Sequence, residues 1–172
     1  MNCLPINSVL VVPEGVYLLK PVFLKSGITV YLEKGAKILA SAARGDYSIL
    51  PGVIDGNGYR INAGTWQGEE DDCFASVFTA YGQNNIAIIG EGEIDCCAPQ
   101  GDWYLNHRVK RGAWRPRGLF FNRCDGVLVQ GITVKNTPSW CIHPYFCTNI
   151  KLYDMNIENP ADMPTTDGVD PD

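Results

Sequence analysis

The chain has 172 residues, of which 45% are hydrophobic and 19% charged, and its formal net charge is −5. This size and apolar content suffice for a buried core, in one domain or in part of a larger one, and exclude a disordered chain. The acidic balance excludes a general nucleic-acid binder, because phosphate affinity rests on a surplus of lysine and arginine.

Residues 1–7 lack the basic region and the long apolar core of a secretory signal, and no later stretch is long enough to span a membrane. We therefore expect a cytoplasmic protein with no membrane partner, or a secreted one if the true N-terminus is missing. Seven cysteines at irregular spacing do not indicate a disulfide framework. We interpret them as buried free thiols, since Cys141, His143 and Cys147 lack the spacing of zinc ligands. No metal and no cofactor is predicted.

Alternating apolar stretches recur along the chain and predict short β-strands rather than helices. Four of them open with Gly or Asn before an apolar residue: residues 27–32, 85–90, 126–131 and 149–154. Each is followed by a bend and a second apolar pair, as in residues 131–134 and 154–157.

The predicted strands form an internal repeat. Val127 precedes Ile150 by 23 residues and follows Ile86 by 41, a little under twice 23. Units of this length hold two or three short strands, as one turn of a parallel β-helix does, whereas a propeller blade of about 40 residues fits only the longer spacing. The prediction is one all-β domain over residues 1–172. Without an amphipathic capping helix, we expect an incomplete stack, truncated at both ends.

Two irregular segments, residues 47–72 and 96–114, interrupt the repeat. Long loops of a solenoid project from one face and often line a binding groove. The second segment runs into a basic stretch, residues 107–117. This stretch is either a solvated loop or a groove wall that attracts an anionic substrate, with Trp114 offering a flat apolar face.

Motifs in order along nearly the whole chain resemble glycoside hydrolase family 28, the polygalacturonases and their relatives. They are residues 11–17, 32–36, 90–95, 115–117, 136–140 with 142–144, and 166–170. The resemblance implies a right-handed parallel β-helix that hydrolyses α-1,4-galacturonide links in pectin with inversion. The implied partner is an acidic polysaccharide or oligogalacturonide.

The first catalytic signature of that family, Asn-Thr-Asp-Gly-x-Asp, corresponds to residues 165–170. The resemblance makes Asp167 a catalytic carboxylate that activates water. Thr165 stands in place of the family's Asn, so the hydrogen bonding that orients Asp167 is expected to differ. The residues expected to bind substrate are His143, Asp170, Arg115, Arg117 and Trp114.

Outside this context the same residues have simpler interpretations. Asp167 and Gly168 alone would be an ordinary turn, and His143 a histidine of the core or of a loop. Trp140 is expected to pack in the core. Calcium binding by Asp167, Asp170 and Asp172 is the weakest alternative, because three carboxylates without further oxygens make no cage.

Inverting hydrolysis needs a carboxylic acid and a carboxylate about 6.5–9.5 Å apart. In an extended segment Asp167 and Asp170 point to opposite faces. Asp170 and Asp172 share a face, but Pro171 between them favours a turn. We therefore expect the partner of Asp167 on the next coil, about 7–8 Å away on the diagonal.

The family's later Asp-Asp, Gly-His-Gly and Arg-x-Lys signatures are not found in order, and Asp71 and Asp72 lie upstream in an irregular segment. The chain is therefore expected to carry only the first catalytic motif and to be inactive alone. Two alternatives stay open: a non-catalytic β-helix that binds acidic polysaccharide through residues 108–117, and a degenerate product with no role of its own. Exo or endo action, the type of pectin and the oligomeric state are not decided by the sequence.

Overall fold

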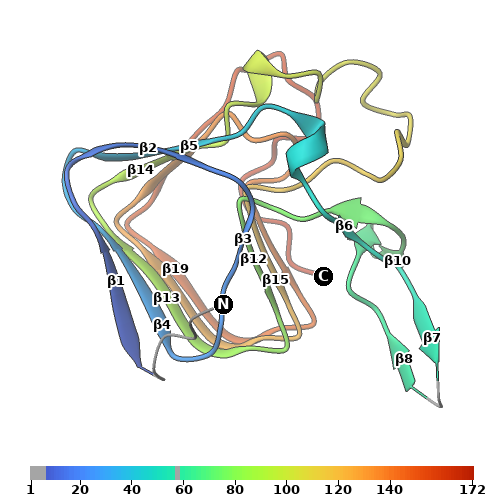
Figure 1. Ribbon diagram of the computed structural model, residues 1–172, viewed down its shortest axis with the longest axis horizontal. Coiled ribbons are helices and arrows are strands. Elements are labelled where there is room, and N and C mark those ends of the chain that lie inside the picture. Colours follow the sequence, from blue (N-terminus) through green and yellow to red (C-terminus); the bar gives the residue numbers. More distant parts are fainter. Residues whose placement is uncertain (1–6, 57–58) are drawn as a thin grey trace.

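The computed structural model describes residues 7–56 and 59–172. The expectations for the extreme N-terminus, Cys3 included, lie outside the described residues. Successive coils of strands stack on one another, and Figure 1 shows them overlaid around a shared interior. No helix in the described part of the chain has the length and apolar character needed to cross a bilayer.

Three parallel sheets form the walls of the coils. The first contains β1 (Ser8–Val12), β4 (Ile28–Leu32), β13 (Asn84–Gly90), β16 (Asp125–Gln130) and β19 (Thr148–Tyr153). The second contains β2 (Gly15–Leu19), β5 (Ala36–Ala40), β14 (Glu93–Asp95), β17 (Thr133–Lys135) and β20 (Asn156–Glu158). The third contains β3 (Val22–Phe23), β12 (Phe78–Tyr81), β15 (Leu119–Asn122) and β18 (Ile142–Tyr145).

Short elements lie in the connections that lead from the second sheet to the third. Three antiparallel pairs join β6 (Ile49–Leu50) to β11 (Cys73–Phe74), β7 (Ile54–Gly56) to β8 (Tyr59–Ile61), and β9 (Thr65–Trp66) to β10 (Glu69–Glu70). The 3-10 helices of the described residues are η1 (Arg44–Asp46) and η2 (Ala98–Gln100).

The predicted fold class, a parallel β-helix, is confirmed. Ile86 pairs with Val127, and Val127 pairs with Ile150, so each spacing in the repeat measures one coil. The longer spacing is therefore a single coil enlarged by a loop, and not nearly two coils. The strands of the third sheet were not identified from the sequence, because both of their faces are buried and they show no alternation.

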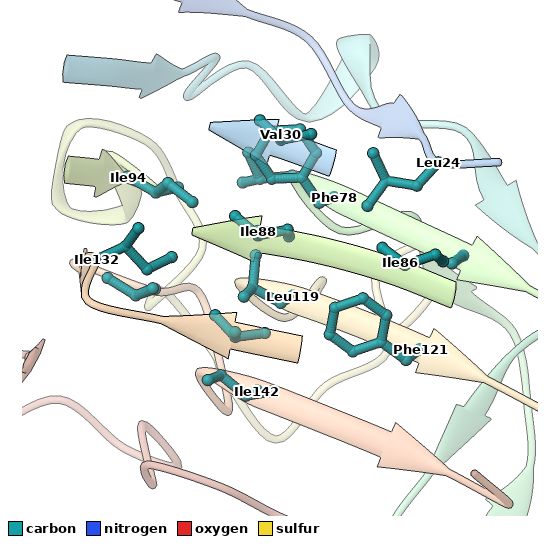
Figure 2. Close-up of a cluster of buried hydrophobic side chains, with 14 of the residues drawn as sticks. Leu24, Val30, Phe78, Ile86, Ile88, Ile94, Leu119, Phe121, Ile132 and Ile142 are labelled. Atoms are coloured by element: carbon teal, nitrogen blue, oxygen red, sulfur yellow. The ribbon is translucent and has the colours of Figure 1, made fainter. Parts of the chain in front are cut away.

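The core fills the space inside the coils. In the first sheet Val30, Ile88 and Val129 occupy equivalent positions on successive strands and are at most 1% exposed. Figure 2 shows Ile88 with Leu119 and other buried side chains converging on this interior. Stacking identical positions buries a continuous apolar column, which a single coil could not do.

The outer face of the third sheet is covered as well. Phe120 and Tyr145 project from it and pack against Leu50 of the first irregular segment and against Cys73 and Ala75, which directly follow that segment. In Figure 1 the strands β6 to β10 lie beside this sheet, and the C-terminus lies between the two. The irregular segment and the last residues of the chain therefore lie on the same side of the third sheet.

Candidate functional site

The acidic segment at residues 167–172 extends the third sheet. The Cys141 amide donates to the Asp167 carbonyl (2.9 Å), and Val169 pairs in parallel with Ile142. The Asp170 amide donates to the Ile142 carbonyl at 3.0 Å, and the Asp172 amide donates to the Pro144 carbonyl at 3.1 Å. The segment is thus an added strand on β18.

The predicted turn at Pro171 is wrong. Alternate residues of a parallel strand donate to one neighbour, and here the donors on the side of β18 are Asp170 and Asp172. Pro171 falls between them, at a position where the missing N–H breaks no bond to β18. Asp170 and Asp172 therefore share a face, as expected for an extended segment. Asp167 is exposed and Asp170 is half-buried, and the expectation that their side chains point to opposite faces stays a prediction.

His143 connects a buried guanidinium to this acidic segment. Arg117 Nε donates to His143 Nδ1 at 3.0 Å, so Nε2 carries the ring proton and donates to Asp172 Oδ2 at 3.0 Å. The ring is fully buried, and burial together with the Arg117 charge lowers the pKa of His143 to about 3. Both nitrogens are engaged, so His143 is placed to orient Asp172. Its contact with substrate stays a prediction.

Asp170 lies beside His143 and is the carboxyl with the most perturbed titration in the segment. Burial and then the charges of Asp167 and Asp172 raise the pKa of Asp170 to about 6, and Arg117 opposes the shift. Its Oδ2 is buried and has no hydrogen-bond partner among the described residues. A carboxyl group in this position holds its proton at mildly acidic pH.

The metal hypothesis has no support in this geometry. Across residues 7–56 and 59–172, no three His, Cys, Asp or Glu side chains are grouped so that they could hold an ion. The six cysteines in that part of the chain are free, and five are buried, as predicted. His143 is unavailable to zinc because Arg117 and Asp172 occupy its nitrogens.

The basic stretch divides into two parts. Lys110 and Arg111 are exposed and pair with Asp71 and Asp102, respectively, as in a solvated loop. Arg115 and Arg117 are 4% and 0% exposed, so for these two the interpretation as a solvated loop is wrong. The remaining question is what their charges bind.

Within the described chain, neither buried arginine has a carboxylate as an ion-pair partner. Arg115 donates to the Pro138 carbonyl at 2.7 Å and to Thr165 Oγ1, and its Nε has no partner in the residues described. Burial lowers the pKa of Arg115 to about 10. An uncompensated buried charge is destabilising, and an incoming anion would offset that cost.

A stack of indole rings adjoins these arginines. The Trp66 ring stacks on Trp114 with centroids 4.7 Å apart and on Trp140 with centroids 4.9 Å apart. Trp114 Nε1 donates to Asp71 Oδ2 at 2.7 Å, so Asp71 orients an aromatic side chain. Trp140 is buried, as expected. The role of Trp66 was missed, although a tryptophan in a glycine-rich segment was its signal in the sequence.

A pocket of about 580 Å³ opens beside the indole stack. Both irregular segments contribute to it, as predicted for loops that line a groove. Its lining residues are Trp66, Gln67, His107, Arg108, Trp114, Arg115, Pro164 and Thr165. The pocket combines a flat apolar surface with cationic groups, and its volume is within the range of small-molecule sites, about 300–1,000 Å³.

Thr165 connects the pocket to the acidic segment. Its φ is 57°, a left-handed conformation that strains a β-branched residue and that asparagine tolerates. Its hydroxyl accepts from Arg115 and donates to the Pro164 carbonyl at 2.7 Å. These bonds hold the strained residue two positions before Asp167, where the sequence had led us to expect altered hydrogen bonding.

The buried His143 makes stability depend on pH. Its folded pKa is about 3 and its ordinary value 6.5, so the unfolded chain alone binds this proton between those values. The contribution of the neutral His143 to the free energy of unfolding is fully present above pH 6.5. It is lost as the pH drops, and the loss is about 3 kcal/mol at pH 4. In His143→Gln, we expect the free energy of unfolding, measured with urea, to depend less on pH by that amount.

Asp170→Asn provides the matched variant with the opposite sign. The folded pKa of Asp170 is about 6 against 3.8, so its protonation stabilises the folded chain as the pH falls. The contribution of Asp170 to the pH dependence of stability is smaller than that of His143, because the Asp170 carboxyl is partly exposed. Asp170→Asn should therefore lose stability more steeply towards pH 4 than the wild type does.

Equal pH slopes of the free energy of unfolding in wild type and in His143→Gln would contradict the assignment of a neutral His143.

Comparison with known proteins agrees with this geometry. The sequence profile of glycosyl hydrolases family 28 matches residues 5–172. A protein named "Probable polygalacturonase" from Vitis vinifera is 29% identical over 167 residues, which are 95% of this chain and 32% of that protein. The chain thus spans about a third of the length of that relative.

Two solved structures share the fold. The hyperthermoactive exopolygalacturonase from Thermotoga maritima superimposes with a TM-score of 0.70 at 27% identity, over 95% of this chain and 41% of that one. The family 28 exopolygalacturonase of Yersinia enterocolitica gives a TM-score of 0.73 at 21% identity, over 98% of this chain and 36% of that one. With its signature residues placed on an added strand of a parallel β-helix, the chain belongs to glycosyl hydrolases family 28.

Proposed function

We propose that the protein hydrolyses α-1,4-galacturonide links in pectin with inversion. The observation that carries this proposal is Arg115, a buried guanidinium without a carboxylate partner among the described residues, beside a stacked indole pair in an open pocket. A galacturonate unit has the two matching features, a carboxylate and an apolar ring face. Relatives that are named polygalacturonases support an acidic pectin substrate.

In this proposal Asp167 is the carboxylate that activates water. It is exposed, while the neighbouring Asp170 is partly buried, has a raised pKa and would hold its own proton at mildly acidic pH. The carboxylic acid that assists the leaving oxygen would lie on a coil stacked on residues 167–172. A diagonal neighbour there is about 7–8 Å away, within the inverting range of about 6.5–9.5 Å.

The binding part of the proposal is tested with Arg115→Gln. Glutamine keeps a donor for the Pro138 carbonyl and removes the charge, so the fold should persist while the dissociation constant for a tetragalacturonate rises about tenfold or more. Calorimetric titration measures the affinity.

Arg108→Gln is the matched control, because Arg108 also lines the pocket but is exposed. Its effect should be about threefold or less and should vanish at high salt. A neutral galactose oligomer should bind weakly to wild type and to both variants. Unchanged tetragalacturonate affinity in a folded Arg115→Gln chain would overturn the assignment of Arg115 as the carboxylate site.

The second candidate is a non-catalytic β-helix that binds acidic polysaccharide. Arg115, which has no carboxylate partner among the described residues, favours this second candidate equally, because binding of an anion there needs no reaction. Binding of tetragalacturonate would support both functions, and only a measurement of hydrolysis separates them.

A further inference from the structure

Two cysteines occupy the same position on adjacent coils. The strands before them pair Asn122 with Tyr145, and the strands after them pair Asp125 with Thr148. The same offset places Cys124 directly beside Cys147. Each cysteine follows a residue in the left-handed conformation, Arg123 (φ 53°) or Phe146 (φ 49°), so both turns have the same local shape.

Hydrogen bonds hold the two turns together. The Cys124 amide donates to Cys147 Sγ at 3.3 Å, and the Thr148 amide donates to the Cys124 carbonyl at 2.9 Å. Equivalent residues on adjacent parallel strands are about 4.8 Å apart at Cα. This spacing lies inside the range of about 4.4–6.8 Å that a disulfide tolerates.

We propose that Cys124 and Cys147 are an oxidisable thiol pair, which a low-molecular-weight disulfide converts into a disulfide that joins adjacent coils. In the described chain Cys147 is the point of attack, because it is half-buried and is therefore the more accessible of the two thiols. Cys124 is 2% exposed and is the resolving thiol. This inference concerns the 172-residue chain, because the coil that the proposed function stacks on residues 167–172 would also cover Cys147.

The exchange has two balanced steps. The Cys147 thiolate attacks one sulfur of the small disulfide, forms a mixed disulfide and releases one small thiolate. Cys124 then loses its proton to solvent, attacks Cys147 Sγ and releases the second small thiolate. Two protein thiols are oxidised to one disulfide, and one small disulfide is reduced to two thiols.

The titration of the two thiols agrees with this order. The hydrogen bond from the Cys124 thiol lowers the pKa of Cys147 to about 7, while the same bond and burial raise the pKa of Cys124. Burial raises the pKa of Cys96 and of Cys97. Near pH 7, Cys147 should therefore react about tenfold faster than those thiols.

The cross-link would stiffen the turn that anchors the acidic segment. The Phe146 amide, next to Cys147, donates to the Asp172 carbonyl at 2.8 Å. Closing the loop between Cys124 and Cys147 also restricts the unfolded chain. We expect oxidation to raise the melting temperature by about 5–10 °C.

The test uses the native chain with 5,5′-dithiobis(2-nitrobenzoate), an aromatic disulfide that releases a coloured thiolate. Wild type should rapidly release two thiolates per chain and keep no adduct. Digestion with trypsin and chymotrypsin should then give Cys124 and Cys147 peptides joined by a disulfide. Cys124→Ser should release one thiolate rapidly and retain the adduct on Cys147.

Cys147→Ser should lose the rapid phase, and Cys97→Ser, which changes a thiol outside the pair, should behave as wild type. A stable adduct on wild-type Cys147, a cross-link between other cysteines, or a rapid phase that survives in Cys147→Ser would each overturn the proposal. Dithiothreitol should reverse both the cross-link and the rise in melting temperature, and failure to do so would contradict a reversible disulfide.

Discussion

Asp167→Asn is expected to lower the rate of polygalacturonate hydrolysis about a thousandfold, because the amide cannot accept the proton of the attacking water. Asp167 is exposed at the start of the added strand, and its backbone carbonyl is fixed by the Cys141 amide at 2.9 Å. The substitution leaves this backbone bond in place, so the loss should appear in kcat. Initial rates of reducing-end release measure the effect.

The rate is to be measured in a chain that continues through the family's Asp-Asp and Gly-His-Gly signatures, since we propose that residues 1–172 alone do not hydrolyse pectin. Asp162→Asn is the control, because this substitution changes the charge equally at an exposed residue that lies outside the signature. Full activity in Asp167→Asn, or in residues 1–172 alone, would contradict the assigned roles. Hydrolysis absent from the longer chain, with tetragalacturonate binding intact, would favour the non-catalytic alternative.

Gly90→Ala is expected to destabilise the fold by about 3 kcal/mol or more. Gly90 ends β13 with φ at 126°, a conformation that L side chains rarely adopt. A Cβ there would lie 2.0 Å from the Leu32 carbonyl oxygen, which belongs to the backbone of the previous coil. Neither coil can shift without breaking the register of the stack. Urea unfolding followed by tryptophan fluorescence measures the change.

Gly45→Ala is the matched control for this substitution. A Cβ at Gly45 meets no atom within 4 Å, and its φ lies outside the left-handed range. Its effect should be within about 1 kcal/mol of zero. If Gly90→Ala unfolds at the same urea concentration as Gly45→Ala, the coils do not approach each other as closely as described.

Much of the fold was available from the sequence, because two sheets of the β-helix have an alternation of inward and outward residues. Val127 and Ile150 repeat at the spacing of one coil, and both face the core or its open end. The third sheet could not be predicted from the sequence, because its outward-facing residues, such as Phe120 and Tyr145, are buried like its inward-facing ones. An irregular segment distant in sequence supplies that second covering layer, which no local pattern encodes.

The candidate site was only partly available. The family signature pointed to Asp167, and alternation placed Asp170 and Asp172 on one face. The turn expected at Pro171 did not form, because the bonds to β18 are made by the residues on either side. Trp66 entered the site through stacking on Trp114, a contact between segments that are far apart in the chain.

The sequence by itself determined the solenoid, the length of its shorter coil and the family. These follow from the periodic spacing of apolar residues and from the order of the family motifs along the chain. Only the tertiary structure decided which charges are available for function. Lys110 and Arg115 belong to one basic stretch, yet Lys110 pairs with Asp71 while Arg115 is buried without a carboxylate in the described chain. The physical reason is that burial and pairing depend on the segments that fold over a residue, and not on its neighbours in sequence.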